Sequence, residues 1–453
     1  MTKPDDQEGE GRDSRKGMRQ LAFEEPSMVG RESERKRLVD YWQRARRSNG
    51  PVFVCLHGVS GTGKSRLARW LLRHLQVVDD AEVLWGTHGP TGGPSDGLSR
   101  MLGRYFGCVG CRNEAIGGRI DDRLQQIGLY TDAPERRESI VEELAGLIEQ
   151  RNAPTGTSAG GSGRARRHAA AWSLLERLSR RSPVAVWLDD VHWSKEALDL
   201  VEHGLAQTDL EGGPCLFVAT VSDEDLASRP VERVQLAELC ASERAFELEV
   251  PPLEPADQRE LIRSALPLSE HLVGRLVERT DGNPLFALQV ISDWVDRDLL
   301  VSTDEGLAFG DAEEAPLPNE LHEVWRRRVD RLLDEFSESM RERALKALEV
   351  AAALGTTVDF REWELACRQR GLEIPDLLPH ALLGSQLARE LGDGKSGAFV
   401  HGMLRESIER RAREEGRYRV AHRACAEMLV ARDGEEQVSA ERFAFHLYEG
   451  GEY

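Results

Sequence analysis

The stretch that decides the fold is Gly58-Val59-Ser60-Gly61-Thr62-Gly63-Lys64-Ser65. Two glycines separated by four residues and followed at once by lysine and serine have the spacing of a phosphate-binding loop. An apolar run, Val52 to Leu56, precedes the octet, and a helical pattern, Arg66 to Leu75, follows it. This is the strand, loop and helix order that such a loop requires, so the octet predicts a nucleotide-binding domain.

The residue types of the loop indicate how it would bind a nucleotide. Glycines permit backbone conformations in which successive N–H groups converge on phosphate oxygens, and the helix N-terminus adds a favourable dipole. Lys64 supplies a mobile positive charge between the β- and γ-phosphates, and the Ser65 hydroxyl is placed to bind Mg²⁺. The candidate nucleotide-binding residues of this segment are Gly58, Ser60, Gly61, Thr62, Gly63, Lys64, Ser65 and Arg66.

A second segment supplies the carboxylates that a magnesium–phosphate site needs. The run Val184 to Leu188 reads as a buried strand, and Asp189 and Asp190 follow at its carboxyl end, where α/β sheets bind ligands. Asp189 is the candidate metal ligand together with Ser65, directly or through water. Asp190 is the candidate for orienting or deprotonating the attacking water, which makes Asp190 and Lys64 candidate catalytic residues.

Short apolar runs alternate with longer helical patterns over the first half of the chain, which predicts a parallel α/β sheet. We expect a disordered tail over residues 1–26 and a nucleotide-binding domain over 27–250, with a flexible insertion at 153–163. Beyond residue 250 the strand runs largely stop and helical periodicity takes over. The predicted strands are Val52 to Leu56, Val83 to Trp85, Val184 to Leu188, Leu216 to Thr220 and Phe246 to Val250.

Composition narrows the class of protein. A length of 453 residues fits two to four domains, and 40% hydrophobic residues with 31% charged residues is a globular profile. The formal charge of −19 makes nucleic acid or an anionic membrane an unlikely partner. The seven scattered cysteines indicate reduced thiols, and no long apolar segment or hydrophobic signal core is present, so we expect a cytoplasmic protein.

Four motifs in this order resemble the signature of the signal-transduction ATPases with numerous domains, an AAA+-like group that includes the ATPase module of large LuxR-type regulators. The resemblance spans about residues 28 to 413. Its motifs are Met28 to Glu34, the phosphate loop, Leu188 to Trp193 and Gly282 to Phe286.

This resemblance implies a helical lid over residues 251–312, a winged-helix domain over 313–413 and a sensor region that begins with the helices of 414–453, which look like the start of a tetratricopeptide array. It also implies an ADP-locked form that ATP releases for self-association or for an effector protein. It favours adenine over guanine, and it places Val29, Gly30 and Arg31 against the adenine or ribose. Pro284 would contact the base, and His401 would reach the β-phosphate of ADP.

The sequence departs from the family pattern near the end of the strand Leu216 to Thr220. The family commonly has an arginine there to read the γ-phosphate, whereas this chain has Ser222 followed by Asp223, Glu224 and Asp225. We therefore expect slow or partner-dependent hydrolysis, with Thr220 as the remaining polar group that reads the phosphate or the water. Two alternatives stay open, a DNA-binding initiator or transcription regulator and a nucleotide-bound scaffold that does not hydrolyse.

Overall fold

The computed structural model describes residues 26–91, 97–109, 111, 113–129, 134–148, 160–207, 212–310, 318, 320–391, 394–433 and 440–451. A five-stranded parallel sheet with the strand order β2-β3-β4-β1-β5 organises the first half of the chain. The expected α/β sheet is thus confirmed, with each predicted strand in its place. The strands are β1 (Pro51–Gly58), β2 (Glu82–Thr87), β3 (Val184–Asp189), β4 (Cys215–Ser222) and β5 (Ala245–Glu249).

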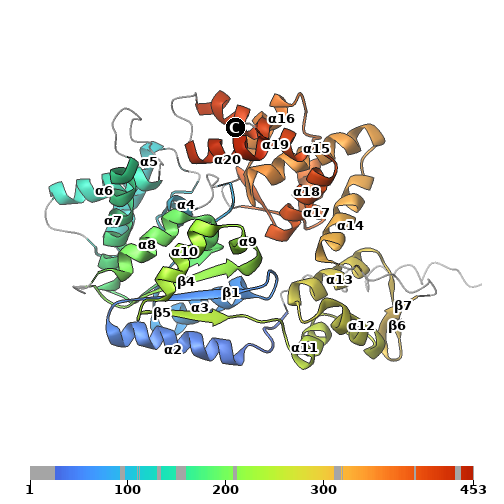
Figure 1. The fold of residues 1–453 in the computed structure, drawn as a ribbon, viewed down its shortest axis with the longest axis horizontal. Coiled ribbons are helices and arrows are strands. Elements are labelled where there is room, and N and C mark those ends of the chain that lie inside the picture. Colours follow the sequence, from blue (N-terminus) through green and yellow to red (C-terminus); the bar gives the residue numbers. More distant parts are fainter. Residues whose placement is uncertain are drawn as a thin grey trace, which may run out of the picture.

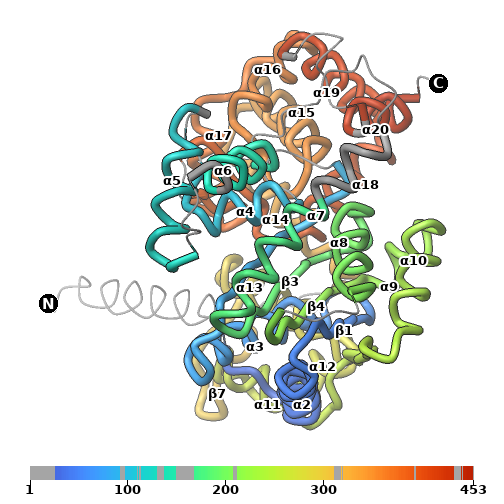
Figure 2. The backbone as a smooth tube through the Cα atoms, turned by 90° about the vertical axis from the view of Figure 1, so that its left-hand side faces the viewer, coloured from blue at the N-terminus to red at the C-terminus, as the bar shows by residue number. Residues whose placement is uncertain are grey.

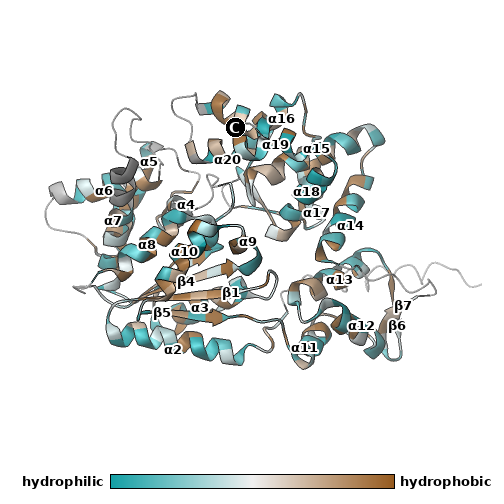
Figure 3. Ribbon diagram, viewed as in Figure 1, coloured by the Kyte–Doolittle hydropathy of each residue, from teal (hydrophilic) through white to brown (hydrophobic). Residues whose placement is uncertain are grey.

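Helices cover both faces of this sheet because its strands are apolar on both sides. Along β1, Val54 and Leu56 pack toward α2 and α3, whereas Phe53 and Cys55 belong to the core on the other face. Figure 3 shows the apolar strands between helices of mixed polarity. The covering helices are α2 (Glu32–Ser48) and α3 (Lys64–Asp79) on one face, and α4 (Gly97–Tyr105), α5 (Asn113–Gln126), α6 (Pro134–Ile148), α7 (Gly160–Ser179), α8 (Lys195–Leu205) and α10 (Pro230–Cys240) on the other.

Two short helical turns, η1 (Val191–Trp193) and α9 (Asp223–Ala227), follow β3 and β4. They lie at the carboxyl edge of the sheet, beside the end of β1. A polar residue at the end of each strand directly precedes these turns: Asp190 precedes η1, and Ser222 precedes α9. The polar groups of three neighbouring strands therefore converge on one edge.

After the sheet domain the chain forms the helices α11 (Pro255–Ala265), α12 (Glu270–Thr280) and α13 (Pro284–Asp296). A hairpin of β6 (Leu300–Thr303) and β7 (Gly306–Phe309) follows, which the sequence did not predict in this mainly helical region. Gly306 has a φ of 111° and lies against the Pro267 carbonyl, so a side chain would not fit at this turn. We call residues 251–310 the lid.

The rest of the chain is mainly helical and carries a three-stranded antiparallel sheet with the order β8-β10-β9. One apolar core runs without a break from Ile262 in the lid to Leu429. In Figure 1 the lid lies to the lower right of the sheet, and the region after it lies above the lid and extends over the top of the sheet domain; Figure 2 shows this last region above the sheet from the side. The elements are α14 (Leu321–Asp334), α15 (Glu338–Leu354), β8 (Thr357–Asp359), α16 (Phe360–Gln369), α17 (Leu378–Gly384), β9 (Ala388–Glu390), β10 (Ser396–Phe399), α18 (Gly402–Glu414), α19 (Tyr418–Asp433) and α20 (Ala440–Gly450).

Two expectations from the sequence fall partly outside the described residues. The predicted disordered tail lies there except for Pro26, and so do residues 153–159 of the predicted flexible insertion. Residues 160–163, which composition assigned to that flexible insertion, instead form the first turn of α7. The four small residues Gly160 to Gly163 misled the prediction because glycine weakens a helix without excluding it.

All seven cysteines are free thiols. Within the described part of the chain, no helix combines the length and the apolar character needed to cross a bilayer.

Candidate nucleotide-binding site

The phosphate loop joins the end of β1 to the start of α3. Gly58, Gly61 and Gly63 have φ angles of 144°, 85° and 103°, which residues with a side chain rarely adopt. A Cβ atom at Gly58 would lie 2.6 Å from the carbonyl oxygen of Val250, and one at Gly61 would lie 2.7 Å from Oδ1 of Asn283. The loop is therefore a close-packed backbone cradle of the kind that surrounds phosphates.

Lys64 folds back over this loop. Its Nζ donates to the carbonyl oxygens of Gly58 and Val59, each at 2.8 Å. Burial lowers the pKa of Lys64, and the nearby carboxylates of Asp190, Asp223, Glu224 and Asp189 oppose that effect. A buried ammonium group held only by backbone carbonyls suits the site of an anionic ligand, because a phosphate would give it a charged partner.

Ser65 and Asp189, the two expected metal ligands, are in direct contact. The Ser65 hydroxyl donates to Oδ1 of Asp189 at 2.7 Å, and the Thr220 hydroxyl donates to the same oxygen at 2.6 Å. Burial raises the pKa of Asp189, whereas these two hydrogen bonds lower it. A hydroxyl and a carboxylate are hard oxygen ligands that fit Mg²⁺, which commonly keeps few protein ligands and completes its shell with phosphate and water. When bound there, Mg²⁺ would neutralise charge on the phosphates.

Asp190 lies next to this pair in the left-handed conformation, with a φ of 52°. Its N–H donates to the Thr220 hydroxyl at 2.9 Å. Burial and the charge of Asp189 raise the pKa of Asp190 well above its ordinary value, and Lys64 opposes the rise. A carboxylate with a raised pKa is a better proton acceptor, which fits the candidate role of a general base.

Thr220 is fully buried in β4, the strand between β1 and β3. Its hydroxyl donates to Asp189 and accepts from Asp190, so it orients both aspartates. The sequence had suggested Thr220 as a reader of the phosphate or the water. The contacts instead make it a positioning residue between the two carboxyl groups, and direct contact with phosphate stays a prediction.

The segment Val29-Gly30-Arg31 joins the loop to the lid. The Arg31 guanidinium donates to the carbonyl oxygens of Thr62 at 3.1 Å and of Pro251 at 2.6 Å, and it is buried. Val29 packs in a small apolar cluster with Leu253 and Leu261. These residues therefore hold the junction between the two parts of the chain, and their expected contact with adenine or ribose stays a prediction.

Two further candidates lie near this junction. Gly30 has a φ of 64° and approaches Asp257 closely. Arg66 donates to the carbonyl oxygen of Pro26.

Pro284 is the first residue of α13, and its neighbour Asn283 contacts the phosphate loop directly. Nδ2 of Asn283 donates to the Ser60 carbonyl oxygen at 2.9 Å, while Oδ1 caps α13 by accepting from the Phe286 N–H at 3.1 Å. Sequence reasoning singled out Pro284 and missed Asn283. The available signal was an asparagine immediately before a proline at the start of a helical pattern, which is a common helix cap.

His401 precedes α18 and faces the helix that begins at the phosphate loop. Part of His401 is exposed. Desolvation by the surrounding protein nevertheless lowers the pKa of His401 to about 4, and the charges of Arg389 and of Arg69 in α3 lower it slightly further. Arg69 also lowers the pKa of Asp189. The position of His401 near the site is compatible with its expected role, and contact between His401 and the β-phosphate stays a prediction.

One turn into α18, Glu406 faces the acidic turn after β4. Burial raises the pKa of Glu406 to about 7; Arg405 lowers it, and Asp225, Glu409 and Glu224 raise it further. Helix α18 thus approaches the nucleotide-binding edge from the C-terminal region.

Acidic residues after β4 border the loop. Oε2 of Glu224 accepts a hydrogen bond from the Ser60 N–H at 3.1 Å, and Asp223 lies 3.5 Å from Nδ1 of His57. Asp225 lies 3.7 Å from Nε2 of the buried His192. The sequence indicated a charge of the wrong sign for phosphate here, but it did not reveal that Glu224 bonds the loop itself.

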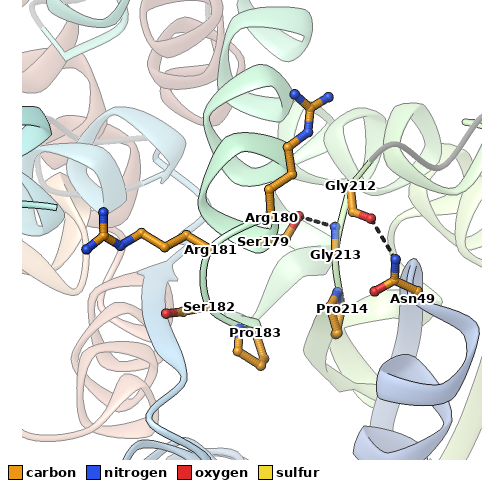
Figure 4. A pocket seen from close by; sticks show the side chains of 9 residues that line it. All are labelled: Asn49, Ser179, Arg180, Arg181, Ser182, Pro183, Gly212, Gly213 and Pro214. Atoms are coloured by element: carbon orange, nitrogen blue, oxygen red, sulfur yellow. Dashed lines mark hydrogen bonds between the residues drawn. The ribbon is translucent and has the colours of Figure 1, made fainter. Parts of the chain in front are cut away.

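A separate polar pocket of about 330 Å³ lies at the opposite edge of the sheet. Figure 4 shows its lining, with Ser179 bonded to Gly213 and Asn49 bonded to Gly212. Pro183 and Pro214 precede β3 and β4, so this pocket is at the amino ends of the strands and plays no part in the nucleotide site.

The comparison with protein families agrees with the presence of a phosphate-binding loop. Residues 27–218 match the model of the AAA ATPase domain. No curated protein matches the sequence.

Three solved structures are similar over most of the chain. The Aeropyrum pernix ORC1 protein, solved in complex with DNA, is 16% identical, with a TM-score of 0.40 over 88% of this chain and 96% of that one. The Aeropyrum pernix ORC2 protein, solved with ADPNP and ADP, is 12% identical, with a TM-score of 0.39 over 88% and 98%. The Cdc6p protein of Pyrobaculum aerophilum is 14% identical, with a TM-score of 0.37 over 87% and 98%. The phosphate loop and the paired aspartates both lie within residues 27–218, the part of the chain that matches the AAA ATPase domain model.

Proposed function

We propose that this chain is a nucleotide-controlled switch. It holds ATP or ADP with Mg²⁺, hydrolyses ATP slowly, and changes conformation with the bound nucleotide to control self-association or binding of an effector protein. The observation that carries this proposal is that the phosphate loop of the sheet domain is in direct contact with the part of the chain that follows the sheet. Asn283 of the lid bonds the loop, and Glu406 of α18 faces the acidic turn that borders it.

The arrangement of charges supports slow turnover. In this proposal Asp190 acts as the general base, and Lys64 and Mg²⁺ would stabilise charge on the phosphates. The edge of β4, however, presents Ser222 and three carboxylates where a cation would stabilise the transition state. Arginines that act on the transferred phosphate raise kcat by about 10³–10⁵, so a site without one in place is expected to be slow.

The arrangement also supports retention of the nucleotide. A ligand between the loop and α13 would have to pass the Asn283 contact to leave. In this proposal the contacts that the family resemblance implies favour ADP in the closed form. They are made by Val29, Gly30, Arg31 and His401. The helices 414–453 would be the first part of a tetratricopeptide-like sensor region.

The direct test is to identify the nucleotide that co-purifies with the chain and to measure phosphate release. We expect bound ADP, and turnover well below the roughly 1–100 s⁻¹ of kinases. Asp190→Asn should abolish the release while keeping the nucleotide, and Lys64→Ala should lose the nucleotide. An empty wild-type site that also fails to bind added ATP or ADP would refute the proposal. Phosphate release absent from both wild type and Asp190→Asn would indicate a non-hydrolysing scaffold.

A DNA-binding regulator is the second candidate, and one observation favours it. The order α15, β8, α16, α17, β9, β10 with a three-stranded antiparallel sheet is that of a winged helix. The net charge of −19 opposes this role, yet neither the fold nor the comparisons support excluding nucleic acid. Duplex binding that weakens steeply with added salt would favour this candidate.

A further inference from the structure

Glu224 takes up a hydrogen-bond donor of the phosphate loop. The Ser60 N–H donates to its carboxylate at 3.1 Å. The N–H groups of such loops are the groups that bind phosphate oxygens, so the carboxylate stands where an oxyanion of the ligand would accept. Because Glu224 is exposed, the bond with Ser60 rather than burial defines its position.

The position of Glu224 relative to Lys64 indicates which phosphate it opposes. Nζ of Lys64 donates to the carbonyl oxygen of Val59, and the N–H of the next residue, Ser60, donates to Glu224. In phosphate loops this lysine reaches the β- and γ-phosphates, which carry the most negative charge of the nucleotide. A carboxylate bound to the Ser60 N–H, next to the peptide carbonyl that holds Lys64, therefore repels ATP, which carries the additional charge of the γ-phosphate, more than it repels ADP.

We propose that Glu224 is a specificity-determining residue that discriminates against the γ-phosphate, so that the resting site prefers ADP. This inference rests on the proposed function as a nucleotide switch. Entry of ATP requires the Glu224 carboxylate to leave the Ser60 N–H, because one N–H cannot serve a carboxylate and a phosphate oxygen together.

Helix α9, which carries Glu224, connects the displacement of this residue to the C-terminal region. Asp225 follows Glu224, is held beside His192, and faces Arg405 and Glu406 of α18. Ser222 caps the helix by accepting from the Asp225 N–H at 3.4 Å, so residues 222–225 form one unit. Displacement of Glu224 by the γ-phosphate would shift this unit against α18. The acidic turn thereby links the identity of the nucleotide to the position of the C-terminal helices.

The test compares the affinities of ADP and of a non-hydrolysable ATP analogue, each with Mg²⁺, by titration calorimetry on the nucleotide-stripped chain of 453 residues. Glu224→Gln keeps an oxygen that can accept from Ser60 but removes the charge, and Glu224→Ala removes both. Asp223→Asn is the matched control, because it removes one charge from the same helix at a residue that lies 3.5 Å from His57 and, among the described residues, makes no hydrogen bond to the loop. Circular dichroism and thermal unfolding verify that the exposed substitutions leave the fold intact.

We expect both Glu224 variants to shift the ratio of the two affinities toward the ATP analogue by about tenfold, the effect of one partly screened charge. Asp223→Asn should shift it by about threefold or less. A ratio unchanged in both Glu224 variants, or shifted equally by Asp223→Asn, would overturn the role of Glu224 while leaving the switch intact. Failure of every form to bind either nucleotide would overturn the switch itself, and this inference with it.

Discussion

Replacing Thr220 by valine should weaken the sheet domain more than its small size suggests. Valine has nearly the same shape but no hydroxyl, so the change removes the donor to Asp189 at 2.6 Å and the acceptor for the Asp190 N–H at 2.9 Å. A hydrogen bond to a charged group contributes about 1.5–3 kcal/mol, and a buried N–H left without a partner costs about 1–3 kcal/mol. Since one hydroxyl makes both bonds, we expect a total loss of about 2–4 kcal/mol rather than their full sum.

The loss should depend on pH, because one of the two bonds is made to a carboxylate. Burial raises the pKa of Asp189 above its ordinary value of 3.8, and the Thr220 bond opposes that rise. In the variant the folded-state pKa rises further, so ionised Asp189 destabilises the fold more. For a raised carboxyl pKa, stability is highest below the unfolded pKa and falls as pH rises through the folded pKa. The difference between variant and wild type should therefore be largest at neutral pH and shrink in acid.

The assay is urea unfolding of the nucleotide-free chain at neutral and mildly acid pH, with hydrogen exchange of peptides from β3 and β4 to localise the effect. Thr220→Ser is the matched control, since it restores the hydroxyl and removes only a methyl group, and it should recover most of the loss. If Thr220→Val stays within about 0.5 kcal/mol of wild type at neutral pH, the proposed positioning of both aspartates is wrong.

Three further predictions concern the edge of the site. Gly61→Ala should weaken nucleotide retention by at least about tenfold, because the φ of 85° at this position and a Cβ 2.7 Å from Asn283 force the lid away from the loop. The dissociation rate of a fluorescent ADP measures the retention, and an unchanged rate would refute the prediction. Ser65→Ala should reduce affinity for the nucleotide about 10–100-fold in the presence of Mg²⁺ and little in its absence, as titration with and without EDTA would reveal. Burial raises the pKa of Glu406 from 4.5 to about 7, so the contribution of Glu406 to stability is most favourable in acid and is lost as pH rises through 7. The melting temperature of the wild type should fall across that pH range, and the melting temperature of Glu406→Gln should not. Parallel profiles of the two proteins would contradict the raised pKa of Glu406.

The central features of the fold followed from the sequence because they depend on local patterns. The octet Gly58 to Ser65 fixes a strand, a loop and a helix by itself, and the continuous apolar run before Asp189 identifies a strand buried on both faces. The sheet and the placement of Asp189 next to Ser65 were therefore predictable.

The parts that sequence missed depend on contacts between distant segments. Asn283 meets Ser60 across 223 residues, and Glu224 meets the same residue across 164, and no local pattern reports either pairing. The β6–β7 hairpin was missed for another reason. Its strands have four residues each, too few to establish an alternation against the helical periodicity that precedes them.

The unbroken core from Ile262 to Leu429 determines which parts of the chain can move independently. Lid and C-terminal region share that core, so they would rotate as a single rigid body relative to the sheet. The chain enters this body through Val250 to Leu253, where two prolines stiffen the backbone and Arg31 anchors the Pro251 carbonyl. These residues are the natural pivot, and they lie directly against Gly58 of the phosphate loop. A small change at the phosphates thus acts close to the pivot. The resulting displacement of the protein is largest far from the pivot, among the last helices.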